Sequence, residues 1–118
     1  MSRIRKFQKR KSNPNLVKLI SEMLSTRKRI WKDVAERLAK PRRLYANVNL
    51  SKLERYVSPD EIAVVPGKVL GGGEITKPIK VAALSFSESA RKKITSAGGE
   101  CISLIQAIQM EGKFRIIV

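Results

Sequence analysis

Residues 62–84 read IAVVPGKVLGGGEITKPIKVAAL, and this stretch decides the fold class. It contains two apolar runs, 62–65 and 79–84, whose length and branched side chains are typical of buried strands. We expect the first strand to end at Pro66-Gly67, because proline cannot donate a hydrogen bond within a sheet. The glycines at 71–73 predict a loop whose backbone can approach a partner closely.

Helical and extended patterns alternate after this stretch. Ser85 or Ser87 is expected to cap a helix that ends at Gly98-Gly99. Three segments follow: a short strand at 101–102, a helix at 104–110 and a terminal strand at 114–118. Because extended pieces are followed by helices, the sequence predicts an α/β fold.

The part of the chain before residue 44 has the pattern of two helices. Asn13 and Pro14 suit a helix start, and apolar residues follow at helical spacing, which predicts a helix over 14–26. A second helix over 29–39 is expected to bury an apolar stripe and to stop before Pro41.

Shorter elements join these helices to residue 62. We expect an extended piece around 48–50, then a short helix that Ser51 caps and that carries Leu53, Tyr56 and Val57. A chain of 118 residues is long enough for one hydrophobic core. The sequence therefore predicts a single domain at 13–118, made of a basic helical part at 13–43 and an α/β part at 44–118.

Residues 1–12 form a strongly basic tail. Its three scattered apolar side chains cannot offset the roughly 1–2 kcal/mol of backbone entropy that each ordered residue loses. We expect this tail to be disordered alone and to become ordered against a polyanion. A tail that serves solubility alone is the alternative.

The net charge is +15, from 25 basic and 10 acidic residues, and it is unevenly distributed. Residues 1–43 hold 15 basic and 3 acidic side chains, a net of +12, whereas residues 44–118 hold 10 and 7, a net of +3. Such a charge opposes compaction unless a polyanion relieves it. Nucleic acid is the expected partner, and an anionic membrane surface is the alternative.

Residue types that enzymes commonly use are scarce. The chain has no histidine, which removes Ser-His-Asp and Cys-His catalysis and His-ligated zinc. The single cysteine, Cys101, lies in an apolar segment and is expected to be a packed thiol. Lys68 is followed by valine instead of the hydroxyl residue that a P-loop needs. We expect no catalytic residues, metal, cofactor or small-molecule substrate.

The remaining candidate chemistry is phosphate binding by Arg and Lys, which neutralise phosphates and release their counterions. Aromatic residues make up 5%, which favours structured RNA recognised by shape over single strands read by base stacking. We expect Trp31 in the core, whereas Tyr45 fits either packing or stacking. Glycines 71–73 either meet RNA or only turn the chain. The candidate RNA-binding residues are Arg3, Arg5, Lys6, Lys9, Arg10, Lys11, Arg27, Lys28, Arg29, Lys32, Arg42, Arg43, Tyr45, Lys52, Arg55, Lys68, Gly71 and Gly72.

A series of short motifs in a fixed order gives the chain a resemblance to a known family. The motifs are KSNPNL at 11–16, IW at 30–31, VA at 34–35, PRR at 41–43, VNLSK at 48–52, VVPGKVLG at 64–71, VAA at 81–83, FS at 86–87 and AGG at 97–99. The series resembles the large-subunit ribosomal protein 18e family of archaea and eukaryotes, in its archaeal form, and more distantly bacterial large-subunit ribosomal protein 15. It extends over nearly the whole chain.

The resemblance implies a structural constituent of the large ribosomal subunit that binds large-subunit rRNA beside neighbouring ribosomal proteins. It also implies an irregular β-β-α superhelix for the folded part, here preceded by the helical segment and the tail. Lys11, Arg42, Arg43, Lys52 and Lys68 match basic positions of the family and carry over as expected RNA contacts.

The expected location is the cytoplasm, because no apolar run approaches the roughly 18 residues of a membrane span and a lone cysteine suits a reducing compartment. We do not expect an obligate homo-oligomer. Two other functions remain open: a DNA-packaging protein, and an RNA-modifying enzyme with a nucleotide-like cofactor at the glycine loop.

Overall fold

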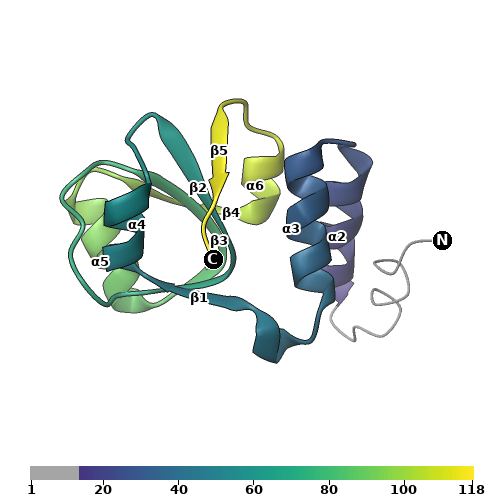
Figure 1. The fold of residues 1–118 in the computed structure, drawn as a ribbon, viewed down its shortest axis with the longest axis horizontal. Coiled ribbons are helices and arrows are strands. Elements are labelled where there is room, and N and C mark those ends of the chain that lie inside the picture. Colours follow the sequence, from purple (N-terminus) through teal and green to yellow (C-terminus); the bar gives the residue numbers. More distant parts are fainter. Residues whose placement is uncertain (1–13) are drawn as a thin grey trace. The chain divides into compact units, whose positions relative to one another are not determined.

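The computed structural model describes residues 14–118, which form two compact units (Figure 1). The first comprises the described residues up to Tyr45, and the second comprises Ala46–Val118. This division lies close to the boundary expected between residues 43 and 44. The tail predicted at 1–12 lies outside the described residues.

The first unit is a pair of helices followed by a short turn. Helix α2 (Pro14–Ser25) and helix α3 (Arg29–Ala39) lie side by side in both ribbon views, and the 3-10 turn η1 (Arg42–Leu44) follows. Both helices have apolar residues at intervals of three and four, so each presents one apolar face. Ile20, Met23, Trp31, Val34 and Leu38 on those faces have no exposed surface. The two predicted helices are confirmed, and Trp31 is a core residue as expected.

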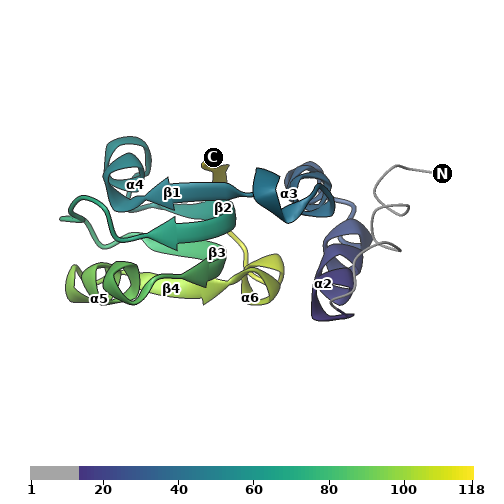
Figure 2. The same cartoon turned by 90° about the horizontal axis from the view of Figure 1, so that it is seen from below.

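The second unit contains a sheet of five parallel strands. They are β1 (Ala46–Asn49), β2 (Glu61–Leu70), β3 (Lys80–Phe86), β4 (Glu100–Ser103) and β5 (Lys113–Ile116). Strands β1 to β4 lie in chain order (Figure 2). β5 pairs with the first half of β2 and β1 with its second half, so these two strands share one edge of β2. The predicted α/β class is confirmed.

Three helices cover the two faces of this sheet (Figure 1). Helices α4 (Leu50–Tyr56) and α5 (Glu88–Ser96) contribute Leu50, Leu53, Ala90 and Ile94 to the main core cluster. Helix α6 (Leu104–Ile108) packs against β3 and β4 on the other face. Because both faces are covered, β2 is buried over most of its length and its sequence is almost continuously apolar.

The expectation that the first strand ends at Pro66-Gly67 is wrong. β2 continues through both residues to Leu70, and its pairing with β3 shifts register between Val65 and Lys68. The shift accommodates a proline that cannot donate to the ladder. At Gly67 a Cβ atom would lie 2.0 Å from the carbonyl oxygen of Ala46, so glycine is required for β1 to pair here.

Other boundaries differ from the prediction by a few residues. Asn49, and not Ser51, is the residue before the first turn of α4. β3 begins and ends later than expected, α6 ends at Ile108, and β5 ends at Ile116. Ser87 caps α5, with its hydroxyl oxygen accepting from the Ala90 N–H at 3.2 Å, as one of the two expected serines.

Candidate nucleic-acid interface

Nine of the cations predicted to bind RNA lie within the described residues, and all nine are exposed. They are Arg27, Lys28, Arg29, Lys32, Arg42, Arg43, Lys52, Arg55 and Lys68. We call them the unpaired cations, because none forms an ion pair with an Asp or Glu side chain of residues 14–118. The six cations of the tail, Arg3, Arg5, Lys6, Lys9, Arg10 and Lys11, lie outside the described residues.

The Asp and Glu side chains pair with other cations. The ion pairs within residues 14–118 join Arg37 to Asp33 at 3.0 Å, Lys93 to Glu74 at 3.6 Å, Lys113 to Asp60 at 3.8 Å and Arg115 to Glu61 at 3.7 Å. Three further exposed lysines that the sequence did not single out, Lys18, Lys80 and Lys92, also lack an Asp or Glu partner among the described residues.

The turn between α2 and α3 presents three consecutive cations. Arg27 occupies the left-handed region with φ 59°, where its N–H donates to the Leu24 carbonyl at the end of α2. Thr26 Oγ1 donates to the Met23 carbonyl at 2.8 Å and accepts from the Lys28 N–H at 3.2 Å. Glycine is the residue favoured at this left-handed position after a helix. An arginine here costs about 1–2 kcal/mol of backbone free energy.

Arg42 and Arg43 form the second basic group, in η1 directly after α3. The hydroxyl of Tyr45 fixes this turn, because it donates to the Leu38 carbonyl near the end of α3 at 2.5 Å. Burial raises the pKa of the Tyr45 hydroxyl, and the nearby charge of Arg42 acts in the opposite direction. The contact gives Tyr45 a packing role, one of the two roles expected for it.

Glycines 71–73 pack against other parts of the second unit. A Cβ atom at Gly71 would lie 2.0 Å from Ser89 Oγ, and one at Gly72 would lie 2.5 Å from Asn49 Oδ1. Gly73 has φ +92° and lies against Ser51. Lys93 Nζ donates to the carbonyls of Gly71 and Gly73 at 3.0 and 2.9 Å. Their lack of side chains is therefore explained by internal packing, which leaves no phosphate cradle of the P-loop kind at this loop.

Helix α4 carries two of the unpaired cations on its outer face, Lys52 and Arg55. Lys52 Nζ donates to the main-chain oxygen of Val118. Tyr56 lies on the same face and is 47% exposed, although the sequence placed it with the buried residues Leu53 and Val57. The misplacement has a simple cause: Leu50, which precedes the expected helix start, completes the buried stripe instead.

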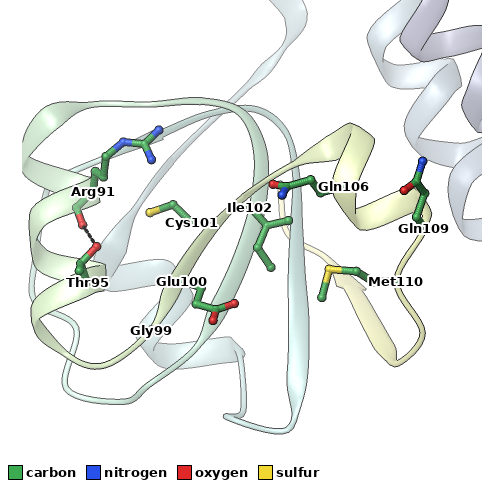
Figure 3. Close-up of a pocket in the computed structure, with 9 residues that line it drawn as sticks. All are labelled: Arg91, Thr95, Gly99, Glu100, Cys101, Ile102, Gln106, Gln109 and Met110. Carbon is green, nitrogen blue, oxygen red and sulfur yellow. Dashed lines mark hydrogen bonds between the residues drawn. The ribbon is translucent and has the colours of Figure 1, made fainter.

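An open pocket of about 690 Å³ lies between α5, β4 and α6 (Figure 3). Its lining includes Arg91, Glu100, the half-buried Cys101, Gln106 and Met110. Burial raises the pKa of the Cys101 thiol, with Arg91 acting in the opposite direction, so the thiol is less nucleophilic than a free cysteine. One carboxylate and one unreactive thiol do not form an acid–base or nucleophilic constellation.

Two further searches of residues 14–118 gave no candidate. No group of three or more Asp, Glu or Cys side chains there is placed to hold a metal ion. Within the same residues, every helix is too short or too polar to cross a membrane.

An α/β body whose exposed cations are largely without carboxylate partners belongs to the class of polyanion-binding proteins. A family model of ribosomal proteins, described as 50S-L15 and 50S-L18e together with a 60S counterpart, matches residues 28–102, more than half of the chain. The chain therefore belongs to this family of ribosomal proteins. The resemblance drawn from the sequence motifs is confirmed, and the family consists of structural proteins, not enzymes.

Archaeal relatives extend the match beyond this segment. The chain is 59% identical over 108 residues to a protein of Archaeoglobus fulgidus named large ribosomal subunit protein eL18, covering 88% of this chain and 92% of the relative. Proteins of the same name from Halobacterium salinarum and Methanothermobacter thermautotrophicus are 50% and 48% identical over 103 residues. These two matches cover 84% of this chain and 88% and 85% of the relatives.

Proposed function

We propose that the chain is a structural constituent of the large ribosomal subunit in the cytoplasm. There it binds and stabilises folded large-subunit rRNA through contacts between Lys or Arg and phosphates. The family and the names of its archaeal relatives support the ribosomal part of this proposal. The rRNA contacts and the neighbouring ribosomal proteins are inferred from the surface of this chain and from that membership.

The distribution of ion pairs is the observation that carries the proposal. Asp and Glu side chains neutralise Arg37, Lys93, Lys113 and Arg115, whereas the nine unpaired cations have no such neutralising partner within residues 14–118. A phosphate that meets an unpaired cation releases its counterions without first displacing an acidic side chain. Binding through these residues is therefore favoured over binding through the neutralised ones.

The tail at 1–12 is proposed to add to these contacts. Its six cations and the absence of acids make it a strong phosphate ligand by charge alone. In this proposal the folded residues dock on RNA, and the tail lies between RNA helices whose phosphates would otherwise repel one another.

Competition between two polyanions tests the proposal and separates it from a DNA-packaging function. Labelled, deproteinised archaeal large-subunit rRNA is bound to the chain at 150 mM salt and displaced with unlabelled rRNA or duplex DNA at equal phosphate concentration. We expect rRNA to displace the label at a concentration at least about tenfold lower than the duplex does, since specific complexes exceed non-specific ones by more than this. Equal displacement by duplex DNA would favour the DNA-packaging alternative.

Replacement of Arg27 by glycine separates stability from binding. Arg27→Gly relieves the left-handed backbone and should raise the free energy of unfolding by about 1 kcal/mol. The same change removes one cation, so the slope of log affinity for rRNA against log salt should become shallower by about 0.7–0.9. Denaturant unfolding and filter binding measure the two quantities.

Lys28→Gly is the matched control. Lys28 precedes α3 in an extended conformation, φ −87°, and its side chain makes no capping bond there. This variant should lose a similar part of the salt slope without gaining stability. If Arg27→Gly leaves rRNA binding and its salt slope unchanged, Arg27 does not contact phosphate.

A further inference from the structure

We infer that the outer face of α4 binds one unstacked nucleotide of RNA, with Tyr56 stacking on the base while Lys52 and Arg55 contact flanking phosphates. The inference rests on the proposed function and deepens it, because it adds a base contact to a surface otherwise argued from phosphate contacts alone.

The helix geometry places the three side chains together. Leu50, Leu53 and Val57 are buried and face the core. Lys52 and Tyr56 are four residues apart, one turn of helix, and Arg55 lies next to Lys52 around the axis. Two cations therefore lie beside one aromatic ring on the exposed side of the same helix.

The exposure of Tyr56 has no explanation in the fold itself. Among the aromatic residues of the described chain, it is the one that is exposed, at 47%. Trp31 is fully buried, and Phe86 is half-buried with the Arg91 guanidinium 5.2 Å from the centre of its ring. The hydroxyl of the other tyrosine, Tyr45, is used in the hydrogen bond to Leu38, whereas that of Tyr56 has no partner within residues 14–118.

The surroundings of α4 favour an approaching phosphate. The carboxylate of Glu54, which could repel it, accepts hydrogen bonds from the Thr76 hydroxyl and N–H, and these lower the pKa of Glu54. They hold the charge toward Thr76 and away from the outer face. At the end of α4, Lys77 Nζ donates to the Val57 carbonyl at 3.0 Å, which offsets the negative end of the helix.

Base stacking and phosphate contact respond differently to salt, and this difference provides the test. Binding of the full-length chain to deproteinised archaeal large-subunit rRNA is measured between 50 and 200 mM salt for Tyr56→Leu, Tyr56→Phe and the unaltered chain. Leucine keeps an apolar side chain but no ring, and phenylalanine keeps the ring. Circular dichroism confirms that each variant folds, as expected for a side chain on the outer face of α4.

We expect Tyr56→Leu to bind about 5- to 100-fold more weakly with an unchanged salt slope, and Tyr56→Phe to stay within about twofold of the unaltered chain. Ultraviolet crosslinking followed by trypsin should place a nucleotide on the peptide of residues 56–68. Binding of Tyr56→Leu at the unaltered affinity, or an equal loss in Tyr56→Phe, would overturn the inference. Failure of the unaltered chain to bind rRNA would instead overturn the proposed function, and the inference with it.

Discussion

Raising the salt concentration from 50 to 200 mM is expected to weaken binding of the chain to large-subunit rRNA by about 10³- to 10⁵-fold, if roughly 6–10 phosphates are contacted. Nine unpaired cations in residues 14–118 suffice for that number before the tail is counted. The cause is counterion release, which becomes less favourable as the concentration of free cations rises. Filter binding or fluorescence anisotropy at four or five salt concentrations gives the slope.

The size of this effect separates electrostatic docking from other modes of association. An interface dominated by apolar contacts would show almost no dependence over this range of salt. A nearly flat response would therefore contradict the proposed function, whatever the absolute affinity.

Leu53→Ala is expected to have the largest effect on stability, a loss of about 2–5 kcal/mol in the free energy of unfolding. Leu53 has no exposed surface and joins α4 to the main core cluster. Small domains are stable by about 5–15 kcal/mol, so this loss is a large fraction of the whole. Urea unfolding followed by circular dichroism measures it.

Leu44→Ala is the matched control for this substitution. Leu44 is 59% exposed, so removing its side chain leaves no cavity and should change stability by less than about 0.5 kcal/mol. Similar losses in the two variants would mean that α4 is not held by Leu53. The presentation of Lys52, Arg55 and Tyr56 would then need another explanation.

The sequence predicted the two N-terminal helices and the α/β class because their signals are local. Apolar residues of α2 and α3 recur at intervals of three and four, and Pro41 marks the end of α3. The strand runs around Val64 and Val81 are short, branched and apolar. Each of these signals depends on neighbours within one turn or one strand.

The errors arose where a distant contact decides the local structure. Pro66-Gly67 has the composition of a turn, yet β2 runs through it because β1 pairs closely with Gly67. Glycines 71–73 raised the question of a nucleotide or RNA contact, and their packing against Asn49, Ser51 and Ser89 depends on three separate segments. No spacing rule in a single sequence reports such contacts.

The candidate interface was predictable in part. Clusters such as Arg27–Arg29 and Arg42–Arg43 are visible in the sequence. Which cations are neutralised is not visible, because Lys113 and Arg115 pair with Asp60 and Glu61 from another strand end. The exposure of Tyr56 likewise depends on where α4 begins.

The most direct test of the central claim compares two double variants that lower the net charge equally, from +15 to +13. Arg42→Gln/Arg43→Gln removes two unpaired cations, and Lys113→Gln/Arg115→Gln removes two that are paired with carboxylates. The first should make the slope of log affinity for rRNA against log salt shallower by about 1.4–1.8, and the second should leave it almost unchanged. Equal changes in both variants would contradict the account, because total charge, and not the unpaired cations, would then govern binding.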